Sequence, residues 1–334
     1  MLDPRTVVTM LKAAAEPTRL RVLMLLRSGE LSVKDLTRIL GQSQPRISRH
    51  LKLMTEAGLI ERYRDGSWAY FQRVETGAAG ALLDGVLAAV ATDDPTLVRD
   101  AARAVALKRE REAAAQTYFQ RHAAEWDRIR ALHVSESTVE AALKEALGGR
   151  RPRLLLDLGT GTGRMLELFA KDYERGVGID INPSMLAYAR GRLEAAGITH
   201  AVVRHGDLYD VALADGAADA VVMHQVLHFL AEPAQAIREA ARVLAPGGRL
   251  VIADFAPHAL EFLRDTHAHE RLGFAANQVA EWLADAGLKT AAIRELAPEA
   301  GASGEKLTVI LWTADRPCTK ENRDGQAARR KVEA

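Results

Sequence analysis

A glycine-rich segment near the middle of this 334-residue chain has the residue types of a ligand-binding turn. The sequence LLLDLGTGTGR places Asp157 at the end of an apolar run, followed by Gly159, Gly161 and Gly163 at alternate positions. Glycines allow a sharp turn and let a ligand approach the backbone amides that begin a following helix. We therefore expect a buried strand, a binding loop and a helix in this order.

The spacing of these glycines discriminates among nucleotide ligands. A dinucleotide-binding loop requires the pattern G-x-G-x-x-G, whereas here the third glycine comes one residue early and Arg164 follows it. The chain also contains no G-x-x-x-x-G-K-S/T segment of the kind that binds a triphosphate. The loop thus disfavours NAD and gives no support for a nucleoside triphosphate.

Two carboxylates follow at the ends of the next predicted strands. The segment VGIDIN ends a second strand at Asp180, whose carboxylate can accept hydrogen bonds from both hydroxyls of a ribose. The segment HAVVRHGDL ends a third strand at Asp207, which suits the exocyclic amine of an adenine. Together with the glycine loop, the two residues predict a nucleoside-containing ligand.

The elements that must position these residues alternate between strand and helix. Further predicted strands lie in ADAVVMHQVLHFL, in ARVLAPGGRLVIADF and, as the final strand, in LTVILWTA. Such alternation predicts an α/β fold with a doubly wound, Rossmann-like sheet, whose ligand binds at the carboxyl ends of the strands.

Residues 115–315 resemble the class I S-adenosylmethionine-dependent methyltransferases, on the ordered motifs DLGTGTG, GIDINPSMLAYAR, GDL and LAPGGRLVIAD. The resemblance implies S-adenosyl-L-methionine as cofactor and S-adenosyl-L-homocysteine as product. It also implies roles for individual residues. Asp157 and the three glycines would hold the methionine end, Asp180 the ribose, Ile181 and Met185 the adenine faces, Asp207 and Leu208 the adenine edge, and Tyr118 and His224 would line or cover the cofactor.

Histidines supply the candidate bases of this predicted domain. Transfer of a methyl group from a sulfonium is an in-line displacement, and a base is needed only when the acceptor must lose a proton. The spacing of His224 and His228 does not predict a metal site, because no Glu accompanies them as in H-E-x-x-H. The catalytic residues stay open, with candidates at His224, His228, His258, His267 and His269.

The acceptor is predicted to be a small molecule. Cys318 is the single cysteine, so the thiols that arsenite methylation requires are missing, and a multi-cysteine metal site is excluded. DNA amino-methylation normally needs an (Asn/Asp/Ser)-Pro-Pro-(Tyr/Phe) segment, and the chain has none.

The amino-terminal part has the pattern of a winged helix. Ser32 and Asp35 form a capping box for one short helix, Gly41 ends it, and Ser43 is expected to cap the next, SQPRISRHLKLMTEAG. Two predicted strands then flank Asp65-Gly66, a strong hairpin signal. A helix-turn-helix followed by a hairpin predicts contact with double-stranded DNA.

Residues 10–76 resemble the ArsR family of bacterial winged-helix repressors, on PTRLRVLMLL, ELSVKDL, SQPRISRHLKLMTEAGLI and RYRDGSWAYF. The resemblance implies dimerisation through flanking helices, for which residues 1–15 and 81–90 are candidates. Metal-sensing members carry two cysteines where this chain has Ser32 and Lys34, so no thiolate site is expected. The candidate DNA-binding residues lie off the apolar stripe or on the wing: Ser43, Gln44, Arg46, Ser48, Arg49, Arg62 and Arg64.

Charge and composition agree with two functions in one chain. Residues 1–76 carry 13 Lys and Arg against 8 Asp and Glu, and the rest of the chain carries 32 against 36. A basic unit joined to an acidic one is typical of a nucleic-acid binder fused to another domain. The expected domains are a winged helix at 1–76, a helical linker or dimerisation segment at 77–114, a methyltransferase domain at 115–315 and a mobile tail at 316–334.

The expected protein is a cytoplasmic, homodimeric, DNA-binding regulator that methylates a small molecule. One cysteine is compatible with a reducing cytoplasm, the chain begins without a signal-peptide layout, and no apolar run approaches the roughly 18 residues of a membrane span. Two alternatives stay open. The second domain could sense S-adenosylmethionine or S-adenosylhomocysteine without turnover, or the winged helix could serve only dimerisation of a metabolic methyltransferase.

Overall fold

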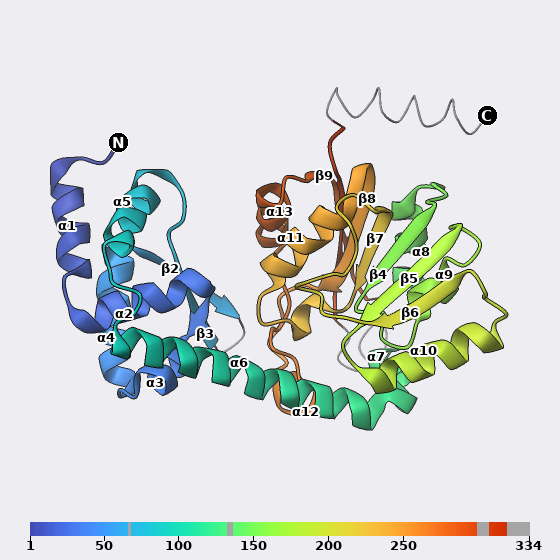
Figure 1. The fold of residues 1–334 in the computed structure, drawn as a ribbon, viewed down its shortest axis with the longest axis horizontal. Helices are drawn as coiled ribbons and strands as arrows, with labels where there is room; N and C mark the ends of the chain where they lie inside the picture. Colours follow the sequence, from blue (N-terminus) through green and yellow to red (C-terminus); the bar gives the residue numbers. More distant parts are fainter. Residues whose placement is uncertain (66–67, 132–135, 299–306, 319–334) are drawn as a thin grey trace. The chain divides into compact units, whose positions relative to one another are not determined.

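The computed structural model describes residues 1–65, 68–131, 136–298 and 307–318 (Figure 1). The chain divides into two compact units, Met1–Ala114 and Ala115–Ala334, which are described separately below. Gly66 of the expected hairpin turn and the part of the expected tail beyond residue 318 lie outside the described residues. Among the described residues, no helix is both long and apolar enough to cross a membrane.

The first unit is helical with one small antiparallel sheet. The sheet has the order β1-β3-β2, and its β2–β3 hairpin is the predicted wing. The helices and strands of this unit are α1 (Pro4–Ala14), α2 (Pro17–Leu25), a 3-10 turn η1 (Leu26–Ser28), β1 (Leu31–Ser32), α3 (Val33–Leu40), α4 (Gln44–Glu56), β2 (Ile60–Asp65), β3 (Trp68–Arg73), α5 (Gly77–Ala88) and the first part of α6 (Pro95–His122).

Local sequence signals explain most of the helix boundaries in this unit. The predicted capping box is confirmed, because the amide of Asp35 donates to Oγ of Ser32 at 3.2 Å and Oδ2 of Asp35 accepts from the amide of Ser32 at 3.0 Å. Gly41 ends α3 in the left-handed conformation. Ser43 is the N-cap residue of α4, as predicted, but its side chain makes no capping hydrogen bond. Pro45, two positions later, has no amide hydrogen to donate.

The hydrophobic core of the first unit contains the predicted apolar stripe of α4. Ile47, Leu51 and Met54 are all buried, as expected from their helical spacing. Leu83 and Leu87 of α5 are buried in the same core. Because these two leucines already pack within the unit, α5 offers less apolar surface for a second chain than its sequence indicated.

Ion pairs attach the first part of α6 to the helices of this unit. Arg21 of α2 donates two hydrogen bonds, at 2.6 and 2.8 Å, to the buried carboxylate of Asp100. Arg111 pairs with Asp35, the residue that also completes the cap of α3. Residues 95–114 are therefore built into the first unit.

The second unit contains a mostly parallel seven-stranded sheet of order β6-β5-β4-β7-β8-β10-β9, in which β10 is antiparallel to both of its neighbours. This arrangement confirms the predicted doubly wound fold. Its strands are β4 (Leu154–Leu158), β5 (Arg175–Asp180), β6 (Ala201–His205), β7 (Ala218–His224), β8 (Leu244–Phe255), β9 (Lys289–Leu296) and β10 (Val309–Asp315). Its helices are the end of α6, α7 (Trp126–Ala131), α8 (Glu136–Leu147), α9 (Arg164–Leu168), α10 (Pro183–Ala195), α11 (Pro233–Val243), α12 (Phe262–His267) and α13 (Ala276–Asp285), with 3-10 turns η2 (Ala123–Glu125) and η3 (Leu227–Phe229).

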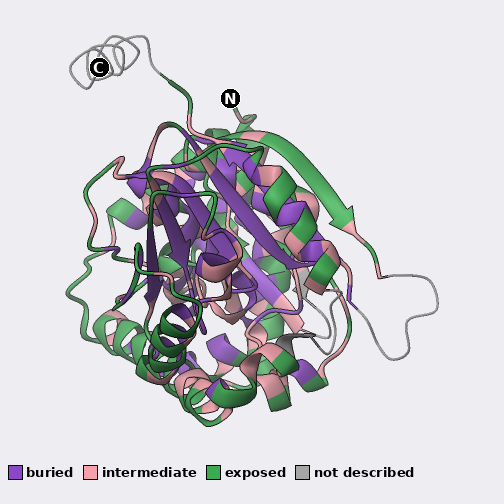
Figure 2. Cartoon of the chain, turned by 90° about the vertical axis from the view of Figure 1, so that its right-hand side faces the viewer, coloured by how far each residue is buried: buried purple, intermediate pink, exposed green. Residues whose placement is uncertain are grey.

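Helices cover both faces of this sheet. Buried residues of α11 and α13 pack on one face, and those of α8, α9 and α10 pack on the other. Figure 2 shows the consequence, with buried strands at the centre and exposed outer faces on the surrounding helices. Because parallel strands covered on both faces must be apolar throughout, the strands read as the continuous hydrophobic runs that the sequence displays. The carboxyl ends of β4, β5, β6 and β7 meet at one edge, where the site lies.

Candidate functional site

The glycine loop after β4 is fastened to the neighbouring strand. The amides of Gly159 and Thr160 donate to the carbonyl oxygen of Ile179 in β5, at 2.9 and 3.0 Å. Thr160 also donates from Oγ1 to Oδ2 of the buried Asp157 at 2.6 Å. Gly159, Gly161 and Gly163 all have positive φ, of 76°, 51° and 79°. Side chains disfavour this region, so the predicted turn depends on the three glycines.

Gly159 also lies against another part of the site. A Cβ atom at this position would come within 2.4 Å of Cγ2 of Val226, the second residue after β7. At Gly161 the nearest atom to such a Cβ would be Nε1 of Trp126, at 3.7 Å. The loop is thus bordered by the segment after β7 on one side and by α7 on the other.

Asp180 lies at the carboxyl end of β5, directly beside the loop. Its Oδ2 accepts from the amide of Gly161 at 2.9 Å and its Oδ1 accepts from the amide of Asn182 at 2.8 Å. Burial raises the pKa of Asp180 above its ordinary value. A carboxylate has about four acceptor positions, so the side chain can still accept bonds from a diol. The residues present therefore fit a ribose.

The other residues predicted for the adenosine differ in exposure. Ile181, next to Asp180 in the chain, exposes 45% of its surface. A flat base could cover this apolar side chain. Met185, in the first turn of α10, is buried, and Leu208 is also buried. Asp207 lies two residues beyond β6, exposed, and its Oδ1 accepts from the amide of Tyr209 at 2.9 Å.

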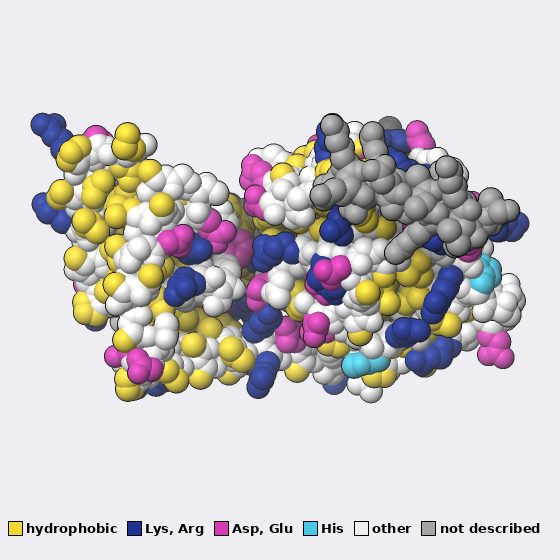
Figure 3. All heavy atoms as spheres, turned by 45° about the horizontal axis from the view of Figure 1, so that its top comes forward, with side chains coloured by type: hydrophobic (Ala, Val, Ile, Leu, Met, Phe, Trp, Pro, Cys, Tyr) yellow, Lys and Arg dark blue, Asp and Glu magenta, His cyan; other side chains and the backbone are white. Residues whose placement is uncertain are grey.

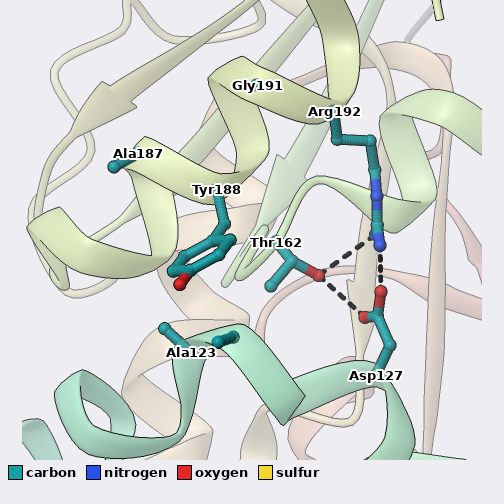
Figure 4. Close-up of a pocket in the computed structure, with 8 residues that line it drawn as sticks. Ala123, Asp127, Thr162, Ala187, Tyr188, Gly191 and Arg192 are labelled. Carbon is teal, nitrogen blue, oxygen red and sulfur yellow. Dashed lines mark hydrogen bonds and ion pairs between the residues drawn. The ribbon is translucent and has the colours of Figure 1, made fainter. Parts of the chain in front are cut away.

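A polar cluster fastens α7 to the glycine loop, and the sequence did not reveal it (Figure 4). Asp127 of α7 pairs with Arg192 of α10, and its Oδ1 accepts from Oγ1 of Thr162 at 2.8 Å. Arg192 also donates from Nη1 to Oγ1 of Thr162 at 3.1 Å. A groove of about 430 Å³ borders this cluster, with Tyr188 on its wall. These residues hold in place the segment that includes Trp126.

Aromatic rings gather beside the loop, around a second pocket. Phe119 lies 5.2 Å from Trp126 and 4.8 Å from Phe229 between ring centroids, both edge to face. Tyr118 packs 4.5 Å from the ring of His122, and burial raises the pKa of Tyr118 to about 12, so its phenol stays protonated at neutral pH. The pocket is lined by Tyr118, Trp126, Ile129, Gln225, His228, Phe229, Phe255, Leu263, His267, His269 and Leu307.

The candidate histidines do not share one helix. His224 is the last residue of β7, whereas His228 lies in the 3-10 turn η3. His228 is 2% exposed, and its Nδ1 is 2.7 Å from Oδ1 of Asp254, at the end of β8. His267 and His269, at and just after the end of α12, are half-buried and line the same pocket, and the ring centroid of His269 lies 4.3 Å from that of His228.

Asp254 and Gln225 are site residues that sequence reasoning missed. Asp254 is fully buried, and its carboxylate accepts from the amides of Leu227 and Phe255 as well as facing His228. A carboxylate inside the apolar run LVIADF was a signal for it. Gln225 has a left-handed backbone at φ 51°, which only the folded chain reveals.

In the first unit, the predicted DNA-binding residues of α4 lie on its open side. Gln44, Arg46, Ser48 and Arg49 are exposed, and the intervening Ile47 is buried. His50 is half-buried, 3.6 Å from a carboxylate oxygen of Glu16, and burial lowers its pKa. The structure thus gives His50 a packing position.

The wing presents one described arginine to solvent. Arg62 on β2 is exposed, while the side chain of Arg64 lies outside the described residues. The two positions that carry cysteines in metal sensors have other partners here. Ser32 belongs to the capping box, and the ammonium of Lys34 lies 5.4 Å from the ring centroid of Trp68.

Two family models match separate parts of the chain. Residues 16–62 match the model described as "Bacterial regulatory protein, arsR family", and residues 156–252 match the model described as "Methyltransferase domain". The chain joins an ArsR-type helix-turn-helix domain to a methyltransferase domain. The winged helix and the glycine loop described above lie in these two domains.

Relatives with curated names match one domain or the other. The demethylmenaquinone methyltransferase of Thermus thermophilus is 41% identical over 122 residues, which cover 36% of this chain and 52% of that protein. The arsenical resistance operon repressor of Escherichia coli is 44% identical over 66 residues, which cover 20% of this chain and 56% of that protein. The chain thus spans about half the length of these curated relatives.

A solved structure supports the fold of the second domain. A chain in the complex between the Haloferax volcanii Trm112 methyltransferase activator and a methyltransferase superposes with a TM-score of 0.50 at 23% identity. The superposition covers 60% of this chain and 97% of that chain. This likeness concerns the fold alone.

Proposed function

We propose that the chain is a DNA-binding regulator whose methyltransferase domain binds S-adenosyl-L-methionine and transfers its methyl group to a small molecule. The proposal rests on one observation: the positive-φ glycine loop lies beside the carboxylate of Asp180, and the exposed side chain of Ile181 follows that carboxylate in the chain. The loop amides suit the carboxyl end of an adenosyl ligand, the carboxylate suits its ribose diol, and the apolar side chain suits its adenine. The bound sulfonium would supply an electrophilic methyl group.

The chain's own residues would orient the reaction and exclude water. The loop amides would hold the carboxyl end of the ligand, and Asp180 would accept from its ribose. The rings of Tyr118, Phe119 and Trp126 would cover the reacting centre. Positioning and exclusion of water contribute most of the acceleration in such displacements.

Calorimetric titration of the full chain with S-adenosyl-L-homocysteine tests the ligand site. We expect saturable binding with one ligand per chain, and no comparable heat with NAD. Incubation with methyl-labelled S-adenosyl-L-methionine and fractions of cell metabolites then tests turnover. Label recovered in a small molecule supports methyl transfer, whereas NAD binding in preference to the adenosyl ligand would refute the proposed site.

DNA binding is the proposed role of the first unit, with the exposed residues of α4 at base edges and Arg62 at phosphate. Dimerisation through α1 is proposed alongside it. Val8 and Leu11 of α1 expose 47% and 42% of their surfaces. Figure 3 shows hydrophobic side chains gathered on the face of this unit at the α1 side. A second copy of α1 would remove these side chains from water.

A regulator that senses the ligand without turnover is the second candidate function. One observation favours it: α6 is continuous from Pro95 to His122 and has residues in both units. In the first unit it carries Asp100 and Arg111, and in the second its Gln116 accepts a 2.8 Å hydrogen bond from Nδ2 of Asn182, next to the proposed ribose site. Tight binding with no labelled product would favour the sensor. A chain that turns over but shows no sequence preference for DNA would instead be a metabolic enzyme.

A further inference from the structure

Helix α6 contains a stretch that no apolar packing holds in place. The helix runs from Pro95 to His122, and Figure 1 draws it as one uninterrupted ribbon. Its buried residues are Asp100 and Leu107, and none of residues 108–117 is buried. Helices shorter than about 12 residues are marginal in water without tertiary contacts. The helicity of residues 108–117 therefore depends on the few polar contacts that this stretch makes.

The first of these contacts holds the stretch to the helix-turn-helix. The side chain of Arg111 is 27% exposed, and it pairs with the carboxylate of Asp35, which is 2% exposed. The same carboxylate accepts from the amide and the hydroxyl of Ser32, at 3.0 and 2.8 Å, and completes the cap of α3. Glu110 adds a pair with Arg38 of α3, which contributes little because both side chains are exposed. Arg111 therefore supports the beginning of α3, the first helix of the helix-turn-helix.

The second contact holds the stretch to the proposed ribose site. Asn182 is buried, and its Nδ2 donates to Oε1 and to the carbonyl oxygen of Gln116, at 2.8 and 3.2 Å. Its Oδ1 accepts from the amides of Ser184 and Met185 and so caps α10. Its own amide donates to Oδ1 of Asp180 at 2.8 Å. Asn182 therefore connects the carboxylate proposed for the ribose to α6.

Both contacts lie on one helix, close together. Arg111 belongs to the first unit and Gln116 to the second, because the boundary falls after Ala114. At about 1.5 Å per residue, the two residues are separated by about 7.5 Å along the helix axis. A ribose bound to Asp180 would restrict the backbone at Asn182, whose amide shares that carboxylate. Because helix formation is cooperative, fixing one end of a marginal stretch stabilises its other end.

We propose that occupancy of the adenosyl site orders residues 108–117 of α6 through the contact of Asn182 with Gln116. The ordered helix then holds Arg111 against Asp35 and changes the affinity of the helix-turn-helix for DNA. This inference deepens the proposed function and rests on it, because it needs both the ligand site and the DNA site. Such a coupling is reciprocal, so specific DNA changes the affinity for the ligand by the same factor.

The coupling is measured as the ratio of DNA affinities with and without saturating S-adenosyl-L-homocysteine, by fluorescence anisotropy of the full-length chain on its preferred DNA sequence. We expect this ratio to differ from one by at least about fivefold in the wild type. Gln116→Leu and Arg111→Met should each reduce the difference to less than about twofold. Gln120→Leu and Arg109→Met change exposed residues of the same types on the same helix, so these matched controls should retain the wild-type ratio.

Ala114→Pro tests the helix while both contact residues remain. Proline removes an amide donor and clashes with the carbonyl oxygen four residues earlier, so it interrupts the helix between Arg111 and Gln116. Ala114 is exposed, so the substitution removes no packing contact. We expect the difference in DNA affinity to fall to less than about twofold in this variant. Ala114→Gln, which a helix accepts, is the matched control and should behave as wild type.

Hydrogen exchange of the backbone amides measures the ordering directly. S-adenosyl-L-homocysteine should slow the exchange of residues 108–117 by about fivefold or more in the wild type. In Gln116→Leu the ligand should still bind, but exchange in this stretch should no longer respond to it. A role of Gln116 in stability alone would change exchange equally with and without the ligand, so the response to the ligand distinguishes the two roles.

Binding of S-adenosyl-L-homocysteine is measured by calorimetry for every variant. If the wild-type chain did not bind it, or had no preferred DNA sequence, the proposed function itself would fail. If both bound and neither changed the affinity for the other, this inference would be overturned and the proposed function would stand. Coupling retained in any folded variant among Gln116→Leu, Arg111→Met and Ala114→Pro, or lost in a matched control, would overturn the route through α6. Should Arg111→Met fail to fold, the other two variants decide.

Discussion

Gly159 allows a prediction that separates backbone strain from close packing. Gly159 and Gly287 have nearly the same φ, of 76° and 77°, so an alanine at either position meets the same left-handed strain, of about 1 kcal/mol. Gly287 has no atom within 4 Å of an added Cβ, whereas at Gly159 that atom would lie 2.4 Å from Cγ2 and 2.9 Å from Cβ of Val226. Overpacking of this kind costs about 1–3 kcal/mol.

We therefore expect Gly287→Ala to lower the free energy of unfolding of the second unit by about 1 kcal/mol, and Gly159→Ala by about 2–4 kcal/mol. Urea denaturation followed by tryptophan fluorescence measures both, since Trp312 is fully buried in the sheet of this unit. Adding Val226→Ala to Gly159→Ala should recover part of the loss, with a coupling of about 1 kcal/mol or more. Equal costs for the two glycine variants, or no coupling to Val226, would refute the argument from close approach.

Three further predictions concern charged side chains. Asp180→Asn should weaken S-adenosyl-L-homocysteine binding by about 1.5–3 kcal/mol in calorimetry, as a charged acceptor is lost. Burial raises the pKa of Asp180 above its ordinary value of 3.8. The affinity of the wild-type chain should therefore be complete at neutral pH and should fall as the pH decreases through that raised pKa, at a higher pH than an exposed aspartate would give. If the same pH dependence persisted in Asp180→Asn, it would belong to another group. Asp100→Asn should destabilise the first unit by about 1–3 kcal/mol in denaturation, because the partly exposed guanidinium of Arg21 loses its charged acceptor, and no measurable cost would contradict a structural pair. Arg62→Ala should weaken DNA binding equally for all sequences and reduce the slope of log affinity against log salt by about one, whereas Arg49→Ala should reduce the preference for one sequence. Fluorescence anisotropy on matched and scrambled DNA measures both effects. The opposite assignment of the two effects to the two variants would contradict the prediction.

Sequence reasoning reached the features that local chemistry determines. The capping box of Ser32 and Asp35, the buried stripe of α4 and the alternation of strands and helices along the second unit depend on residues close together in the chain, so the sequence alone predicts them. The sequence also predicted the glycine loop and Asp180, because the loop comes directly after one buried strand and Asp180 ends the next.

The features that sequence reasoning missed depend on distant residues. Asp254 and His228 are 26 residues apart, and only the pairing of β7 with β8 brings them together. The partners Asp127 and Arg192 are separated by 65 residues. Ser43 is the N-cap of α4 as predicted, but its side chain makes no capping bond, and Pro45 removes one of the two amides that it could cap. Contacts between residues far apart in the chain therefore set the limit of the sequence-based prediction.

The central claim is that one chain reads DNA and binds an adenosyl ligand. DNA fragments selected by the full-length chain from a random pool should be titrated with and without saturating S-adenosyl-L-homocysteine. We predict a preferred sequence, bound at least 1,000-fold more tightly than scrambled DNA at physiological salt, as is typical of specific binders, and an affinity that changes when the ligand is added. Only weak, steeply salt-dependent binding without a preferred sequence, unaffected by the ligand, would contradict the account.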